Sequence, residues 1–216
     1  MAPDPEDVVS DDEIQILQEL MNIAFGKAAA DLAEVMDMHV VLSVPGVGIM
    51  PAPELPRYIC SETLDHPRVS VVGQNFWGDF RGSAFLVLPS SGSKELLSLL
   101  GEQPGTADGA PYEPMDELER ETLMEVGNII IGACVGKLSE LLGTVVRYTP
   151  PSSTIDRSPV DAIPPDLFDS GYSAVVLRTM FCFGDHDVKG FMFLVSSGSS
   201  IRWLKAALGR FMAQYA

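Results

Sequence analysis

Hydrophobic residues recur at helical spacing in two long stretches of the chain, 11–36 and 116–142. Short runs rich in β-branched residues near 39–44 and 144–149 predict a strand after each helix. Each part then contains two more strand-like runs, which are VSVVGQNFWG and GSAFLVL in the first part and SAVVLRTMFCFG and KGFMFLV in the second. Glycine-containing turns predict that each pair forms a hairpin, and shorter helices near 93–100 and 200–214 would close the two parts.

The two parts of the chain also resemble each other residue by residue. NIAFGKAAADLAEVM at 22–36 aligns with NIIIGACVGKLSELL at 128–142, and GSAFLVLPSSGSKELLSLLG at 82–101 aligns with GFMFLVSSGSSIRWLKAALG at 190–209. Self-similarity at a fixed offset indicates an internal duplication. The repeats would therefore share one structure.

The order of predicted elements favours an α+β fold with a mainly antiparallel sheet. We expect two α-β-β-β-α repeats whose long helices pack on the sheet around a pseudo-two-fold axis. The predicted organisation is an acidic tail at 1–10 followed by one domain at 11–216. Within that domain, repeats 11–101 and 116–209 are joined by a Gly- and Pro-containing linker at 102–115.

Charge and composition narrow the possible partners. The net charge of −16 repels nucleic-acid phosphates and anionic membrane surfaces, so we expect no nucleic-acid binding. No uninterrupted apolar run approaches the roughly 20 residues that span a bilayer, so we expect no membrane insertion. Three widely separated cysteines, Cys60, Cys134 and Cys182, are typical of reduced thiols and predict a cytoplasmic protein.

The sequence offers no convincing metal or cofactor site. No CxxC pair occurs, and the three histidines are scattered. The Asp-His-Asp stretch at 185–187 lies between two strand-like runs, which favours a polar hairpin turn over a metal site. We therefore expect the protein to carry no cofactor of its own.

The long helices each carry a polar stripe. Glu19 and Asn22 share a helical face, which Gln15 and Gly26 extend at spacings of four. The second helix repeats the stripe with Glu121, Glu125, Asn128 and Gly132. A purely structural explanation is open for one copy, with solvated acids, a satisfied amide and glycines that allow close helix packing. The retention of Glu, Asn and Gly in both diverged repeats favours a functional role.

A longer spacing makes the pattern specific. Pro45 follows Asn22 by 23 positions, and Pro151 follows Asn128 by the same number. This double motif resembles the CheC family of chemotaxis phosphatases, which includes CheX and FliY relatives. In that family Asp or Ser precedes the Glu by four residues. Gln15 and Glu121 stand at those positions here, and only Glu121 keeps a negative charge.

The resemblance implies an enzyme that accelerates hydrolysis of the aspartyl phosphate of a CheY-like response regulator. Asn22 and Asn128 would orient the attacking water, and Glu19 and Glu125 would anchor the partner by contacting its active-site lysine. The regulator would supply Mg²⁺. The motif prolines would shape a loop beside each helix.

Two other functional interpretations of the same resemblance stay open. A FliM-like protein is a non-catalytic scaffold, although the retained Glu and Asn pairs argue against that reading. An adaptor would bind a response regulator or the deamidase CheD, and this role is compatible with phosphatase activity. A small-molecule hydrolase is disfavoured because the sequence offers no Ser-His-Asp or Cys-His arrangement.

Overall fold

A computed structural model describes residues 9–63, 68–99, 115–159, 161–168, 171–183 and 186–213. Residues 1–8 of the predicted acidic tail and 102–114 of the predicted linker lie outside the described residues.

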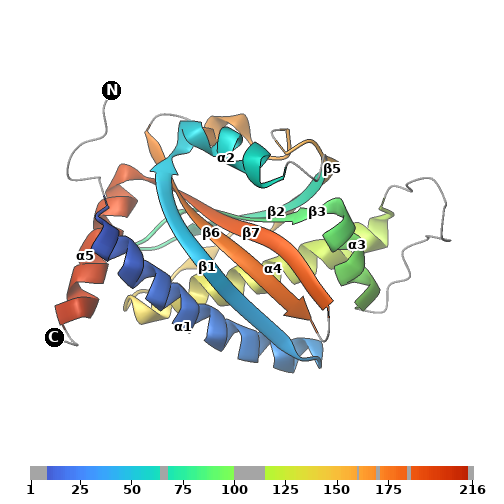
Figure 1. Cartoon of the computed structure of the whole chain (residues 1–216), viewed down its shortest axis with the longest axis horizontal. Helices are drawn as coiled ribbons and strands as arrows, with labels where there is room; N and C mark the ends of the chain where they lie inside the picture. The colour runs from blue at the N-terminus through green and yellow to red at the C-terminus, as the bar shows by residue number, and fades with distance from the viewer. Residues whose placement is uncertain are drawn as a thin grey trace.

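The elements follow the predicted order with two unpredicted additions, a helix at Leu55–Glu62 and a strand at Ser152–Arg157. The helices are α1 (Asp11–Met36), α2 (Leu55–Glu62), α3 (Ser90–Leu99), α4 (Glu117–Leu141) and α5 (Gly198–Ala213), with short 3-10 helices η2 (Ala52–Glu54) and η3 (Pro165–Phe168). The strands are β1 (Val40–Pro51), β2 (Val69–Trp77), β3 (Gly82–Pro89), β4 (Arg147–Tyr148), β5 (Ser152–Arg157), β6 (Tyr172–Phe183) and β7 (His186–Ser197). Figure 1 shows their arrangement.

The strands form one sheet in which every described pair is antiparallel. Its order is β1-β6-β7-β3-β2-β4, with β5 also pairing with β2. The outer strands are exchanged between the repeats: β1 of the first repeat pairs with β6 of the second, and β4 and β5 of the second pair with β2 of the first. The predicted α+β fold with long helices on a mainly antiparallel sheet is confirmed.

The pseudo-two-fold axis passes through the centre of the sheet. Phe85 in β3 pairs directly with Phe193 in β7, and the two residues occupy matching positions 108 apart in the repeats. Their rings stack with centroids 5.0 Å apart. On the helices, Lys137 Nζ lies 3.3 Å from Asp31 Oδ2, and these positions also match, at the helix offset of 106. Equivalent residues meet each other only near a symmetry axis.

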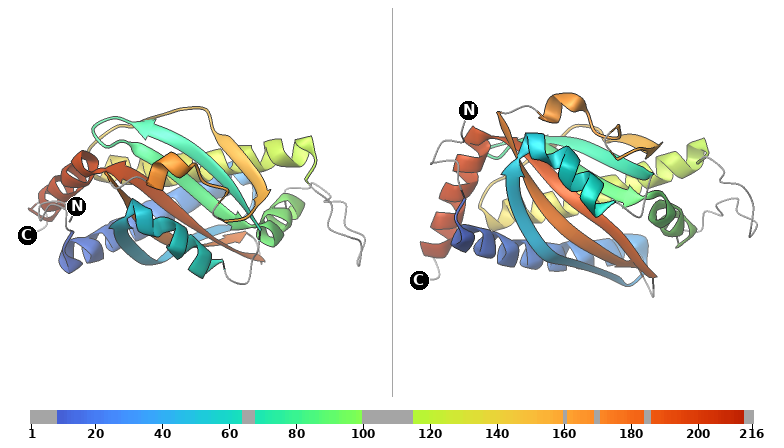
Figure 2. Two further views of the ribbon diagram at one scale, coloured as in Figure 1. Left: turned by 90° about the horizontal axis from the view of Figure 1, so that it is seen from above. Right: turned by 45° about the horizontal axis from the view of Figure 1, so that its top comes forward.

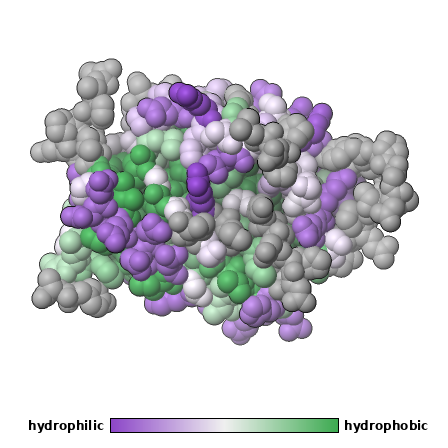
Figure 3. Space-filling view, in the orientation of Figure 1, coloured by the Kyte–Doolittle hydropathy of each residue, from purple (hydrophilic) through white to green (hydrophobic). Residues whose placement is uncertain are grey.

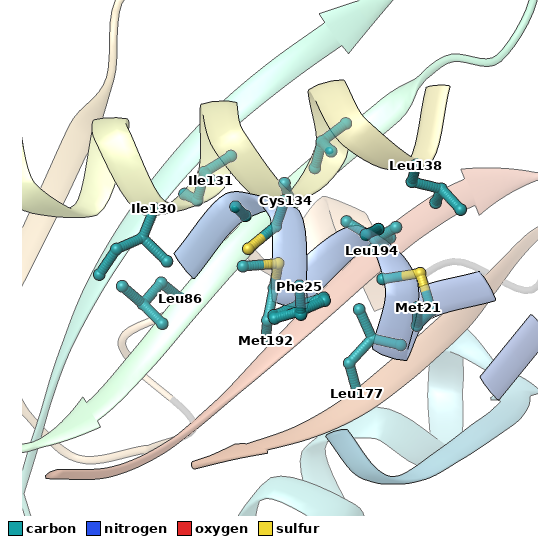
Figure 4. Packing of buried hydrophobic residues seen from close by; sticks show 14 of the residues in the cluster. Met21, Phe25, Leu86, Ile130, Ile131, Cys134, Leu138, Leu177, Met192 and Leu194 are labelled. Carbon is teal, nitrogen blue, oxygen red and sulfur yellow. The ribbon is translucent and has the colours of Figure 1, made fainter. Parts of the chain in front are cut away.

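Helices lie on both faces of the sheet (Figure 2), and each face carries its own hydrophobic cluster. The larger cluster lies between the sheet and the helices α1, α3, α4 and α5. Figure 4 shows Met21 and Phe25 of α1 and side chains of α4 converging on residues of β3, β6 and β7. The smaller cluster covers the other face under α2, η2 and the segment around η3. Both faces of the sheet are therefore buried, which explains its nearly continuous apolar strands.

Several boundaries differ from the sequence prediction. The first strand is longer than 39–44, whereas the predicted strand at 144–149 is reduced to β4. Helix α2 was not predicted because the LPRYICSE segment is short and contains a proline. That proline is tolerated because it lies in the first turn, where no intrahelical N–H bond is lost.

Helix α4 is long and apolar enough to span a membrane by length and composition alone. Half of its apolar window is buried inside the fold, against β2, β3 and α1. Packing of that kind is typical of the core helix of a globular protein.

Candidate functional site

Both stripe-bearing helices begin at a defined capping box. In α1 the Ser10 side chain accepts from the Glu13 N–H and the Glu13 carboxylate accepts from the Ser10 N–H, so Ser10 is the N-cap residue. In α4 the N-cap residue is Asp116, with Glu119 as its partner. These reciprocal bonds satisfy two N–H groups at each helix start and define where each helix begins.

The two stripes lie on different helices, one on α1 and one on α4. Helices α1 and α4 run in opposite directions (Figure 1), and they meet near the contact between Asp31 and Lys137. That contact lies in the C-terminal half of each helix, whereas Glu19, Asn22, Glu125 and Asn128 lie in the N-terminal halves. The fold therefore presents two separate polar stripes and does not combine them into one site.

The first stripe is exposed to solvent. Gln15, Glu19 and Asn22 are all exposed, and among the described residues none hydrogen-bonds the Asn22 side chain. Gln15 and Glu19 line a groove of about 570 Å³ between α1 and α5, together with apolar residues that include Leu20, Ile23, Phe211 and Met212. Hydrophobic surface is also visible near the N-terminal end of α1 in the space-filling view (Figure 3).

The second stripe is more enclosed. Glu121 and Glu125 are exposed, but Asn128 is only partly exposed. Its Oδ1 accepts a hydrogen bond of 2.8 Å from Gln74 Nε2 of β2. The same Gln74 nitrogen donates to the Thr149 carbonyl at 2.8 Å. Sequence reasoning missed Gln74, since a single polar residue in an apolar strand is usually a solvated one.

A glycine beside Asn128 explains how the amide reaches the sheet. A Cβ atom at Gly127 would lie 2.7 Å from side-chain atoms of Val72, so α4 approaches β2 more closely than a larger residue would allow. Val72 is two positions before Gln74 on the same face of β2. In α1 the matching position is Met21, whose side chain is buried in the core.

The two matched glycines of the stripes do not serve close packing. A Cβ atom at Gly26 or Gly132 would have no atom within 4 Å outside its own helix backbone and chain neighbours. The packing explanation for these glycines is therefore wrong. They leave a gap on the helix surface one turn after each asparagine.

The motif prolines interrupt strands. Pro45 lies within strand β1, at the point where the pairing with β6 shifts register between Ser43 and Gly46. Pro151 lies in the break between β4 and β5. The prediction that both shape a loop beside the helix is wrong for Pro45, which lies in an irregular part of a strand. Proline suits such positions because it cannot donate to a ladder.

The buried thiol of Cys134 is not placed for nucleophilic chemistry. Cys134 is fully buried, and burial raises the pKa of its thiol far above the usual range. Cys60 is exposed in α2, away from both stripes. Within the described ranges, no group of three or more His, Cys, Asp or Glu side chains is placed to hold a metal ion.

Comparison with known proteins agrees with the fold and the motif. Residues 118–155, which contain Glu125, Asn128 and Pro151, match the model of the CheC-like family. The chain is 24% identical over 205 residues to "CheY-P phosphatase CheC" of Bacillus subtilis, covering 93% of this chain and 96% of that protein. The chain is therefore similar to the CheC and FliY proteins. It is also 24% identical to "Flagellar motor switch phosphatase FliY" of the same organism, over 74% of this chain and 41% of that protein.

Solved structures share the fold of this CheC/FliY relative. Thermotoga maritima FliY superposes with a TM-score of 0.71 at 21% identity, covering 94% of this chain and 98% of that chain. The FliM middle domain from H. pylori superposes with a TM-score of 0.59 at 15% identity, covering 92% and 99%. Because phosphatase-named and motor-switch proteins both match, the fold alone does not select a function.

Proposed function

We propose that this CheC/FliY relative accelerates hydrolysis of the aspartyl phosphate of a CheY-like response regulator. The observation that carries the proposal is the repeated Glu and Asn pair, presented at the surface on two rigid helices. A relative that aligns along almost the whole chain is named a CheY-P phosphatase, which supports the same substrate class.

The chemistry requires a positioned water more than a strong base. Hydrolysis of an acyl phosphate needs water in line with the leaving carboxylate, and a carboxamide can both donate and accept hydrogen bonds. Asn22 and Asn128 would each enter a docked regulator's active site and hold this water. Positioning of this kind contributes on the order of several kcal/mol to lowering the barrier.

The glutamates would act as anchors. Glu19 and Glu125 are exposed one turn before the asparagines, so a regulator lysine that contacts the carboxylate would set the depth of asparagine insertion. The gaps at Gly26 and Gly132 leave room for the partner on the other side. The regulator itself would supply the Mg²⁺ that neutralises phosphoryl charge.

The alternative is a non-catalytic scaffold or adaptor that binds a response regulator or CheD. Its support is the fold shared with the FliM middle domain. The two proposals differ in one observable: an adaptor binds the regulator without shortening the lifetime of its phosphoryl group.

The test is the time course of phosphate release from a phosphorylated CheY-like regulator with and without the protein. The wild type is expected to accelerate release, and the double variant Asn22→Ala with Asn128→Ala is expected to lose this acceleration by about 100-fold or more. A wild type that binds the phosphorylated regulator without accelerating release would favour the adaptor.

A matched control exists on the same helices. Glu34 and Glu140 are an exposed acid pair that also matches between the repeats, 15 residues beyond Glu19 and Glu125. That spacing corresponds to about 22 Å along a helix, outside the stripes. The variant Glu34→Ala with Glu140→Ala should keep the wild-type rate, which separates a local role from a general effect of lost surface charge.

A further inference from the structure

We propose that Gln74 is a positioning residue of the second site, which locks the Asn128 carboxamide with its oxygen toward the sheet and its NH₂ group toward the partner. The inference rests on the proposed function for its catalytic consequence, but its structural part stands on the hydrogen bonds of Gln74 alone.

The orientation of Gln74 is set by a backbone carbonyl. Gln74 is 6% exposed, and its Nε2 lies 2.8 Å from the Thr149 oxygen. A carbonyl oxygen accepts only, so the Gln74 group that faces it must be the NH₂. Thr149 is itself held to β2, because its N–H donates to the Asn75 carbonyl at 2.9 Å and its hydroxyl accepts from the Asn75 N–H at 3.2 Å.

The orientation of Asn128 follows from that of Gln74. The second N–H of Gln74 Nε2 points at Asn128 from 2.8 Å, so the Asn128 atom that meets it must be the acceptor Oδ1. The opposite amide orientation would place two NH₂ groups face to face. The carboxamide of Asn128 therefore has one preferred orientation before any partner arrives. Within the described part of the chain no group accepts from its Nδ2, which can donate to a water or a phosphoryl oxygen.

The first site has no residue equivalent to Gln74 that could orient Asn22. In β2, Gln74 pairs with Ala84, and in β6, Leu177 pairs with Met192, which is the residue 108 positions after Ala84. Leu177 therefore occupies in the second hairpin the place that Gln74 occupies in the first. Leu177 is fully buried in the core and cannot hydrogen-bond an amide. Asn22 thus keeps its rotational freedom, whereas Asn128 is preorganised.

Placing Gln74 at this buried position lowers stability, which indicates that the residue is retained for its contact with Asn128. Gln74 Oε1 is buried and has no hydrogen-bond partner among the described residues. A buried unsatisfied amide oxygen is destabilising, and leucine at the matching position of the other repeat avoids that cost. A role in orienting Asn128 explains why the polar residue is kept.

The first arm of the test is independent of activity. NMR relaxation of the Asn128 side-chain NH₂, assigned by its loss in Asn128→Ala, should report an ordered group in the wild type and a mobile one in Gln74→Leu, while the Asn22 NH₂ is mobile in both. Ser70→Ala is the control, because Ser70 is also buried in β2 and its hydroxyl has no partner among the described residues. An Asn128 NH₂ that is equally ordered in wild type and in folded Gln74→Leu overturns the proposal.

The second arm measures phosphate release in single-site backgrounds. In Asn22→Ala protein, which retains only the second site, Gln74→Leu should lower kcat about tenfold with little change in KM. It should add no further loss to Asn128→Ala, since no amide remains to be held. An equal fractional loss in both backgrounds would indicate a merely structural role and overturn the proposal. If the wild type shows no phosphatase activity, the proposed function fails, and the NMR arm alone decides the positioning role of Gln74.

Discussion

A carboxamide on a helix surface loses rotamer freedom when it must hold a water, unless a neighbouring group has already fixed it. Asn22 is exposed and unrestrained by described neighbours, whereas Asn128 is held by Gln74. The second stripe also keeps an acid, Glu121, four residues before its glutamate, where the first has Gln15. Both differences predict that Asn128→Ala lowers the phosphatase rate more than Asn22→Ala, which single-variant time courses would measure.

At the same scale, the thiols should differ sharply in reactivity. Burial raises the pKa of Cys134 above its ordinary value of 9.0, so the thiol stays neutral at pH 8 and shielded from reagents. We expect iodoacetamide to label exposed Cys60 in the folded protein and Cys134 only after unfolding, as read by peptide mass mapping. Because the folded pKa is raised, stability from this burial is complete below about pH 9 and declines as the pH rises further. Labelling of Cys134 at the Cys60 rate would contradict the buried placement.

For the stripe glycines, stability and regulator binding are expected to change in opposite directions. Gly26→Ala and Gly132→Ala add a methyl group that meets nothing in the free protein. Each should raise the free energy of unfolding by about 0.5–1 kcal/mol through improved helix propensity. If the gaps receive the partner, each should weaken regulator binding, which calorimetry would detect. Unchanged affinity in a stabilised variant would argue that the gaps have no docking role.

At the scale of elements, the contact of α4 with β2 should be intolerant of added volume. Gly127→Ala places a methyl group against Val72 and is expected to destabilise the protein by about 1–3 kcal/mol, as overpacking does. Val72→Ala in the same chain should recover part of that loss, which a double-mutant cycle of chemical denaturation would show. Strict additivity of the two changes would mean that the residues do not press on each other.

The sequence predicts most of the element order because its hydrophobic periods are clear and are repeated. The apolar runs of β2, β3, β6 and β7 could be recognised as strands without a structure. The exchange of β1 and β5 between repeats could not, since pairing partners far apart in sequence leave no periodic signal. Helix α2 could not be predicted for a different reason. Its eight residues show too little helical periodicity, and they include a proline, which usually argues against a helix.

The candidate site, too, has residues that can be predicted from the sequence and residues that cannot. The Glu and Asn pairs are visible in the sequence because they recur at matched positions in both repeats. The Gln74 contact is not visible, because it joins a strand of one repeat to a helix of the other. The groove beside Glu19 depends on how α5 packs against α1. Packing between helices far apart in the sequence cannot be predicted from local hydrophobic periodicity.

At the scale of the whole molecule, the exchanged strands make each repeat dependent on the other. Within the described sheet, β1 pairs only with β6, and β4 and β5 pair only with β2. Fragments 1–101 and 116–216 should each lack cooperative thermal unfolding when expressed alone, whereas the equimolar mixture should regain it. Circular dichroism would show this, and an independently folded fragment would contradict the account of an intertwined domain.

The central claim is that two surface carboxamides direct water onto a partner's acyl phosphate. The most direct measurement is the lifetime of the phosphoryl group on a CheY-like regulator saturated with Asn22→Ala, Asn128→Ala protein, with binding verified separately. A regulator bound to the double variant is expected to lose phosphate at about its own unassisted rate, whereas saturating wild type should shorten the lifetime. A double variant that binds and still accelerates the loss as the wild type does would contradict the central claim.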